Sequence, residues 1–285
     1  MMLAEYRTRL NDCARFVRFF AVLATVLVLS CVFGAAQEHA AGSKDAVLHP
    51  IVIELFTSEG CSSCPPADAW VQQLDSSQPI PGAQIIVLSE HVTYWDQDGW
   101  KDPYSSVQLT RRQSNYAQGL RISDVYTPQL ILDGGVELHL NDPQQVKQAI
   151  EKAAATPAVF VRLDSIGMDA GDPGTLDGRV EVDAQGRGGE VYVATTLDHA
   201  ESQVLRGENS GHRLKYVAVV EDIVKIGKLE KGKSFDGKFH VKLRPGTDPA
   251  NVRVVAFVQE PGLGRILGAA MEKNATESGL THAKN

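Results

Sequence analysis

The chain has 285 residues and an ordinary composition, with 43% hydrophobic and 22% charged residues. This length exceeds what one core usually needs and predicts about two domains, while the composition excludes a disordered or fibrous protein. The formal net charge of -7 provides no general attraction for phosphate backbones, so no nucleic-acid partner is expected.

Residues 1–36 have the layout of an export signal. An arginine-rich start precedes the uncharged run Phe19–Phe33, and small residues follow up to Ala36. We therefore expect a signal peptide over 1–36, cleaved after Ala36, then a linker over 37–47 and a periplasmic or secreted protein. Two alternatives stay open, an uncleaved signal anchor and a lipoprotein processing site at Cys31, and either would attach the protein to a membrane.

The cysteine count becomes informative once this leader is set aside. Of the four cysteines, Cys13 and Cys31 fall within the leader, so the mature protein is expected to hold Cys61 and Cys64 as an isolated C-x-x-C pair. Export would place this pair in a compartment where disulfides form and persist.

The elements predicted between residues 48 and 156 alternate between strands and helices. Apolar runs rich in β-branched residues predict buried strands, and apolar residues at helical spacing after Pro65-Pro66 predict an amphipathic helix. The order predicts an α/β domain over 48–156. In sequence, the expected elements are strands at 51–56 and 83–88, an aromatic loop at 91–104, a helix at about 106–119 capped by Ser105, a hairpin of strands 129–132 and 136–140, and a helix capped by Asp142.

From residue 157 the hydrophobic period changes to alternation. Glycine- and proline-rich turns separate the alternating segments, which predicts an all-β sandwich over 157–273 and a flexible tail over 274–285. The segments that suggest strands include residues 159–163, 180–182, 191–197, 239–243 and 252–257.

Cys61 and Cys64 lie between a predicted strand and the first turn of a predicted helix. Unpaired N–H groups and the helix dipole at such a position stabilise a thiolate, the form that attacks a disulfide. The pattern predicts thiol–disulfide exchange, with Cys61 as the exposed attacking thiol and Cys64 as the buried resolving thiol. The alternatives are a structural disulfide, which would stabilise so short a loop only weakly, and half of a zinc site, for which further ligands at metal-binding spacing are lacking.

The order strand, C-x-x-C, helix and a distant Thr-Pro before a hairpin resembles the thioredoxin superfamily. The resemblance implies an α/β thioredoxin-like N-terminal domain, here followed by an all-β sandwich-like C-terminal domain. It also implies that Thr127-Pro128 forms a cis peptide bond against the sulfurs, where the Thr127 backbone would pair with a bound peptide. The alternative is an ordinary trans proline that enters an edge strand.

Longer motifs resemble a bacterial family of secreted thioredoxin-like proteins catalogued as a domain of unknown function. They are E-L-F-T-S-E-G-C-S-S-C-P-P-A-D at 54–68, H-V-T-Y-W-D at 91–96, G-W-K-D-P at 99–103, V-Y-T-P-Q at 125–129 and R-G-E-N-S-G-H at 206–212. The resemblance implies a redox pair without an established substrate. Ser62-Ser63 stands where thioredoxin has Gly-Pro, and because this dipeptide tunes the redox potential, the direction of electron flow stays open.

Other residues are candidates near the sulfurs. Glu54, charged within an apolar strand, would relay protons to the resolving thiol as an acid does in thioredoxin, or it would point to an exposed edge. His91, Tyr94 and Trp95 are predicted to line a substrate groove, the alternative being that they pack the long connection against the sheet. Glu59 is interpreted as a solvated loop charge, and residues 206–212 as a turn without chemistry.

Together these features predict an exported thiol–disulfide oxidoreductase. Cys61 attacks, Cys64 resolves and Pro128 shapes the peptide site, with an envelope protein or a small thiol as the substrate and an unidentified redox partner. Neither a cofactor nor a resident metal ion is expected. The alternatives are a periplasmic module that binds copper or zinc through the same thiolates, with His91 as a further ligand, and a binding protein whose sandwich is the functional part.

Overall fold

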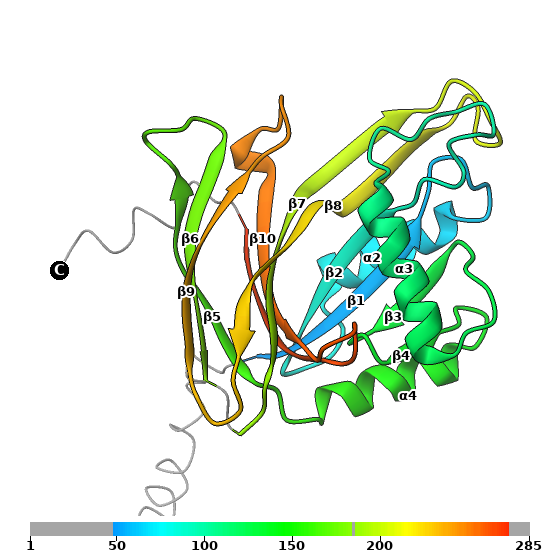
Figure 1. The fold of residues 1–285 in the computed structure, drawn as a ribbon. Coiled ribbons are helices and arrows are strands. Elements are labelled where there is room, and N and C mark those ends of the chain that lie inside the picture. Colours follow the sequence, from blue (N-terminus) through cyan, green and yellow to red (C-terminus); the bar gives the residue numbers. More distant parts are fainter. Residues whose placement is uncertain (1–47, 184–185, 274–285) are drawn as a thin grey trace, which may run out of the picture. The chain divides into compact units, whose positions relative to one another are not determined.

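The structure is a computed structural model that describes residues 48–183 and 186–273 (Figure 1). The expected signal peptide at 1–36, the linker at 37–47 and the tail at 274–285 lie outside these residues. None of the helices within the described ranges is long and apolar enough to cross a membrane.

The first half follows the predicted order of elements. β1 (His49–Thr57) and β2 (Ala83–His91) pair in parallel, with α2 (Pro65–Ser77) between them in sequence. α3 (Val107–Leu120) is capped by Ser106, which accepts a hydrogen bond from Gln108 N–H, so the cap lies one residue later than predicted. β3 (Gln129–Leu132) and β4 (Val136–Leu138) form the expected hairpin, and Asp142 caps α4 (Pro143–Ala154).

The second half consists of strands joined by turns. The predicted segments correspond to β5, β6, β7, β9 and β10, whereas β8 and β11 were not predicted. The strands are β5 (Phe160–Met168), β6 (Thr175–Asp183), β7 (Gly189–Gln203), β8 (Arg213–Leu229), β9 (Phe235–Lys242), β10 (Val252–Gln259) and β11 (Ile266–Lys273), with a short 3-10 helix at Pro249–Asn251 before β10.

One eight-stranded sheet runs through both halves, in the order β11-β10-β7-β8-β2-β1-β3-β4 (Figure 1). β8 forms the junction, because it pairs antiparallel with β7 and lies parallel beside β2. The prediction of a thioredoxin-like α/β domain followed by a separate all-β domain is therefore wrong. The protein is mostly β, with one mixed sheet shared by both halves. The physical reason is that β2 would otherwise present an unpaired edge, which β8 covers.

A second sheet of three strands, in the order β5-β6-β9, packs against the strands of the large sheet contributed by the second half. Alternate side chains from both layers interdigitate in this core. One of the two layers belongs to the shared sheet, so the second half is not an independent sandwich. The buried residues of this core include Val161, Val180, Phe239, Val193, Val254 and Ala256.

Alternation along β1 decides which helix each of its side chains meets. Ile51, Ile53 and Leu55 point to the face that α2 and α4 cover. Val52 and Phe56 point to the opposite face, where they contact residues of α3. The same parity determines on which side of the sheet a polar residue of β1 or β2 lies.

A buried ion pair joins the two halves as well. Arg253 on β10 donates from Nη1 and Nη2 to the two carboxylate oxygens of Asp75 on α2, over 2.6 and 2.8 Å. Burial alone would raise the pKa of Asp75, but the hydrogen bonds and charge of Arg253 hold that pKa below its ordinary value. Such a paired arrangement fixes the position of α2 relative to β10.

Candidate functional site

Two parallel strands bring the cysteine loop and His91 to one edge of the large sheet. β1 ends at Thr57 and β2 at His91, and these two residues are partners in the register. The loop 58–64 continues from β1 into α2, whose N-cap residue is Cys64. Because the carboxyl ends of neighbouring parallel strands open onto the same crevice, a site is expected at this edge.

Cys61 and Cys64 form a disulfide at the start of α2, with their Cα atoms 5.5 Å apart. The N–H groups of Ala67 and Asp68 both bond to the Cys64 carbonyl, so the helix begins directly after the pair. A thiolate released by reduction would therefore lie near the positive end of the helix dipole. The predicted position of the pair at a helix N-terminus is confirmed.

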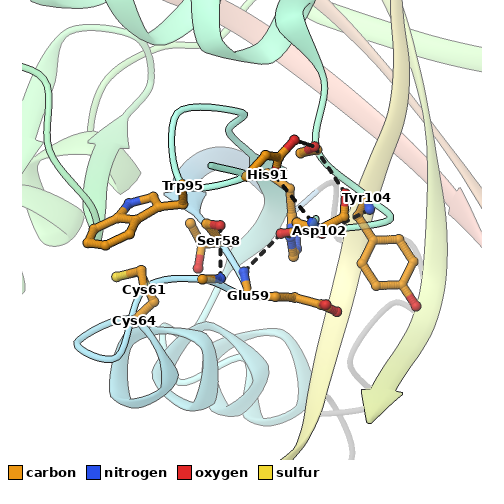
Figure 2. Close-up of polar contacts among 12 residues, drawn as sticks. Ser58, Glu59, Cys61, Cys64, His91, Trp95, Asp102 and Tyr104 are labelled. Atoms are coloured by element: carbon orange, nitrogen blue, oxygen red, sulfur yellow. Dashed lines mark hydrogen bonds and ion pairs between the residues drawn. A yellow bond between two sulfur atoms is a disulfide. The ribbon is translucent and has the colours of Figure 1, made fainter. Parts of the chain in front are cut away.

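Both cysteines are enclosed, each with an exposed fraction of 0%, whereas Ser62 and Ser63 between them are exposed. The prediction of an exposed Cys61 is therefore wrong. Figure 2 shows the Trp95 ring beside the two cysteines. The Trp95 backbone also approaches Gly60 closely, because a Cβ placed on Gly60 would lie 3.2 Å from the Trp95 carbonyl oxygen. The loop that follows β2 thus packs over the cysteine loop.

Thr127 and Pro128 lie against the cysteine loop, and the bond between them is cis, as expected. The Ser63 hydroxyl donates to the Thr127 carbonyl over 3.4 Å and lies 3.3 Å from the Cys61 sulfur. Trp95 Nε1–H donates to Thr127 Oγ1 over 2.7 Å. The structure therefore brings Thr127, Trp95 and the cysteine loop together.

A buried pair of His91 and Asp102 lies next to the cysteine loop (Figure 2). His91 Nδ1 is 2.7 Å from Asp102 Oδ2, and the same carboxylate accepts the Glu59 N–H over 2.8 Å and the Tyr104 N–H over 2.9 Å. Burial opposes protonation of His91, but Asp102 raises the pKa of this imidazole overall. Burial likewise opposes ionisation of Asp102, yet His91 and the N–H donors lower its pKa. The pair therefore favours an imidazolium facing a carboxylate.

Asp68 is a buried acid one helical turn after Cys64. Residues four apart on a helix lie on the same face, so the Asp68 carboxyl lies on the face of α2 that carries Cys64. Thr57 Oγ1 donates to Asp68 Oδ1 over 2.9 Å. Burial raises the pKa of Asp68 to about 7, although His91 and the Thr57 hydrogen bond act in the opposite direction. At neutral pH this group can therefore both accept and release a proton.

Glu59 is buried, so its interpretation as a solvated loop charge is wrong. Its Oε2 accepts the Trp100 indole N–H over 2.7 Å. Burial and the neighbouring Asp102 carboxylate raise the pKa of Glu59. Glu59, Asp68, His91 and Asp102 thus form a cluster of buried titratable groups behind the disulfide.

Glu54 is buried but lies on the other face of the sheet. It accepts Arg112 Nε–H and the Tyr116 hydroxyl, each over 2.6 Å, and both partners belong to α3. The alternative of an exposed edge is wrong. A relay from Glu54 to Cys64 is also not supported, because α2 and Cys64 lie on the opposite face of β1.

The substrate-groove prediction fails for His91, whose exposed fraction is 0%. β8 covers it, since the Tyr216 ring lies 4.7 Å from the His91 ring. Tyr94 and Trp95 are partly exposed, and a role for them in substrate binding stays a prediction.

Three parts of the site were not predicted from the sequence: Asp68, Asp102 and the turn between β7 and β8. In that turn, Asn209 Nδ2 donates to the carbonyls of Glu59 and Cys61, each over 2.9 Å, and the Glu208 carboxylate accepts the Ser62 N–H over 3.0 Å. The spacing of four between Cys64 and Asp68 and the R-G-E-N-S-G-H motif were the available signals. The turn had been interpreted as free of chemistry.

No group of three or more His, Cys, Asp or Glu side chains within the described ranges is arranged to hold a metal ion. His91, the residue considered as a further ligand to the thiolates, instead directs Nδ1 to Asp102.

Comparison with known families and structures gives a family but no activity. The profile of a family described as "Protein of unknown function (DUF1223)" matches residues 52–259. A crystal structure of a protein from Agrobacterium tumefaciens is 25% identical with a TM-score of 0.59, over 79% of this chain and 94% of that chain. The sporulation control protein of Bacillus subtilis is 18% identical with a TM-score of 0.29, over 41% of this chain and 48% of that chain, which is too weak to inform the fold. No curated protein matches the sequence.

Proposed function

The chain belongs to this family of unknown function, and from its own site we propose that it is a thiol–disulfide oxidoreductase that acts through Cys61 and Cys64. The observation that carries the proposal is the disulfide at the N-cap of α2, with the buried acid Asp68 one turn further along the helix. A helix N-terminus favours the thiolate that exchange requires, and a nearby acid can handle the proton.

The exchange can be written in two balanced steps. A partner thiolate attacks the Cys61 sulfur, which forms a mixed disulfide and releases Cys64 as a thiolate that takes up a proton. A second partner thiolate then attacks the partner sulfur, forms the partner disulfide and releases the Cys61 thiolate. Two electrons pass from the partner to the protein, and the reverse sequence reduces a partner disulfide.

Asp68 would serve the proton transfer at Cys64. When the protein reduces a partner disulfide, Cys64 must lose its proton before it can resolve the mixed disulfide, and a buried thiol does so only with a base in reach. A carboxyl with a pKa of about 7 accepts that proton at neutral pH without binding it too tightly.

A purely structural disulfide accounts less well for the same features. Closing a loop with only two intervening residues removes little chain entropy, so the bridge adds little stability. Burying several titratable groups behind it costs desolvation energy. Perturbed acids beside a cysteine pair are more typical of a reactive site.

The leader supports an exported location for this chemistry, in the periplasm or outside the cell. We propose that residues 1–36 direct export and that the partner is an envelope protein or a small thiol. Fractionation of cells that express the full chain, with the mass of the mature N-terminus, tests this part separately.

The redox proposal is tested by equilibrium with glutathione. The experiment uses wild type, Cys61→Ser, Cys64→Ser and the control Ser76→Ala, which changes an exposed position near the end of α2. Each protein is equilibrated in glutathione buffers and alkylated, and its redox state is determined by mass spectrometry. Wild type and Ser76→Ala should convert reversibly between disulfide and dithiol and should accelerate insulin reduction by dithiothreitol, and both cysteine variants should not. The proposal would be contradicted if folded wild type neither exchanged its disulfide with glutathione nor accelerated insulin reduction.

A further inference from the structure

The turn between β7 and β8, residues 204–212, lies directly on the cysteine loop. Its ends are closed by hydrogen bonds between Val204 N–H and the His212 carbonyl and between Gly211 N–H and the Val204 carbonyl. The turn comes from the second half of the chain, about 150 residues after the cysteines, and the pairing of β8 with β2 helps to bring it to them.

Asn209 anchors the turn to the loop. Its side chain is 5% exposed, and the same amide nitrogen donates to the carbonyls on either side of Gly60, those of Glu59 and Cys61. Gly207 adopts a φ of +76°, and a Cβ there would lie 3.3 Å from the Asp98 carbonyl oxygen, so this position also needs a glycine. These contacts hold Glu208, the residue between them, in a defined place.

The Glu208 carboxylate is fixed one peptide bond from Cys61. Its Oε2 accepts the Ser62 N–H over 3.0 Å, and that N–H belongs to the peptide bond formed by the Cys61 carbonyl. Hydrogen bonds from Ser62 lower the pKa of Glu208, so the group is charged at neutral pH. A negative charge is thus hydrogen-bonded to the N–H that follows Cys61, the residue whose sulfur becomes a thiolate on reduction.

Two neighbouring groups act in the opposite direction. The N-terminus of α2 favours a thiolate at Cys61, and the Ser63 hydroxyl, 3.3 Å from the Cys61 sulfur, can turn from the Thr127 carbonyl to donate to it. The balance between these donors and the carboxylate decides how stable the reduced pair is, because a stabilised thiolate makes a disulfide more oxidising.

We propose that Glu208 sets the redox poise of the Cys61–Cys64 pair by destabilising the Cys61 thiolate, which shifts the pair toward donating electrons. This inference rests on the proposed oxidoreductase function and adds a direction that the Ser62-Ser63 dipeptide leaves open. The relevant reaction is balanced: protein disulfide plus two glutathione thiols gives protein dithiol plus glutathione disulfide. Glu208 favours the left side, since the like charge disfavours the thiolate form of the product.

The test compares Glu208→Gln with wild type in glutathione buffers at pH 7 and 8.5. Glutamine keeps the acceptor for Ser62 N–H and removes only the charge. We expect the ratio of reduced to oxidised protein to rise about threefold at pH 8.5, and about tenfold for Glu208→Lys. The effect should be larger at pH 8.5 than at pH 7, because more of the reduced protein then carries the thiolate. A pH titration of reduced Glu208→Gln, followed by absorbance at 240 nm, should give a lower thiol pKa than the same titration of wild type.

The matched control is Glu230→Gln, which removes an exposed glutamate just beyond the opposite end of β8 and should change neither quantity. The difference in the ratio of reduced to oxidised protein between Glu208→Gln and wild type should also become smaller in 1 M NaCl, because salt screens exposed charges. An unchanged or decreased ratio for folded Glu208→Gln, or an equal increase for Glu230→Gln, overturns the inference. Failure of wild type itself to equilibrate instead overturns the oxidoreductase proposal.

Discussion

Two clusters of buried acids lie on opposite faces of β1 and β2, and they differ in what surrounds them. On the α3 face, Glu54 is held by Arg112 and Tyr116. On the α2 face, Asp68 accepts a side-chain hydrogen bond from Thr57 and lies one turn from Cys64. Glu54 is paired with an arginine within the core, whereas burial has the largest effect on the pKa of Asp68, followed by the charge of His91. Burial of a carboxyl group is therefore not enough to identify a proton carrier.

The hydrogen-bond and charge partners of the two acids indicate a structural role for Glu54 and a chemical role for Asp68. Glu90, beside Glu54, has its pKa raised well above the ordinary value by burial and by the Glu54 charge, and its Oε1 lies 3.5 Å from Arg112 Nε. The acids on the α3 face thus share an arginine and lie on the opposite side of the sheet from the cysteines. The pKa of Asp68, raised to about 7, allows proton exchange near neutral pH on the cysteine side.

The largest expected effect separates the two acids directly. Asp68→Asn should slow resolution of a mixed disulfide about 100-fold at pH 7, since the residue can no longer accept the Cys64 proton. Glu54→Gln should leave the rate per folded molecule unchanged. Stopped-flow release of a fluorescent thiol from Cys61 measures both. Equal rates for Asp68→Asn and wild type across pH 5–9 would remove Asp68 from the mechanism.

For the stability of the fold, changes in the α3 cluster should have the larger effect. Arg112→Ala leaves the buried Glu54 carboxylate without its partner, which should cost about 3–5 kcal/mol in the free energy of unfolding measured with urea. Arg112→Met together with Glu54→Gln should recover part of this loss, because no unpaired charge then remains. If Arg112→Ala is as stable as wild type, the α3 cluster is not structural.

The pH dependence of stability gives a finer comparison. Burial raises the pKa of Asp68 above its value in the unfolded chain. The stability that protonated Asp68 gives the folded protein is therefore fully present below about pH 4 and is lost as the pH rises through 7. The side chain of Asp68→Asn stays neutral at every pH. The free energy of unfolding of this variant should match that of wild type near pH 4 and exceed it by roughly 3 kcal/mol at pH 8. Urea unfolding at pH 4.5, 6 and 8 measures this difference. A difference that is constant with pH would show that Asp68 ionises normally in the folded protein.

The smallest effect concerns access to the enclosed disulfide. Asn209→Ala removes both hydrogen bonds between the turn and the cysteine loop, so local opening should become easier and reduction by dithiothreitol about fivefold faster. Asn251→Ala is the control, because Asn251 also makes two side-chain hydrogen bonds to backbone atoms, those of His199 in β7, away from the cysteine loop. Equal acceleration in both variants would point to general loosening of the protein.

Local patterns in the sequence predicted most helices and strands and the position of the cysteine pair. They did not predict the shared sheet, because its junction β8 lies far from β2 in sequence and their pairing is a tertiary contact. The choice of Glu54 failed for a simpler reason. Glu54 has the parity of Val52 and Phe56, which face α3, whereas the apolar positions that meet α2 are Ile53 and Leu55.

Local sequence patterns indicate neither the burial of Cys61 nor the contacts that Asn209 and Glu208 make with the cysteine loop. Loop 58–64 reads as exposed, since it is short and polar between a strand and a helix, and its cover comes from distant segments around Trp95 and residues 204–212. The R-G-E-N-S-G-H motif marked the turn without indicating what it contacts.

Trapping of a mixed disulfide on Cys61 tests the central claim most directly. In Cys64→Ala expressed with its own leader, a partner bound to Cys61 cannot be released by the second sulfur, so a covalent adduct that dithiothreitol removes should accumulate and yield the partner by mass spectrometry. Cys61→Ala with Cys64→Ala provides the background. If Cys64→Ala forms no adduct beyond that background, with a cellular protein or with added glutathione disulfide, Cys61 and Cys64 are not an exchanging pair.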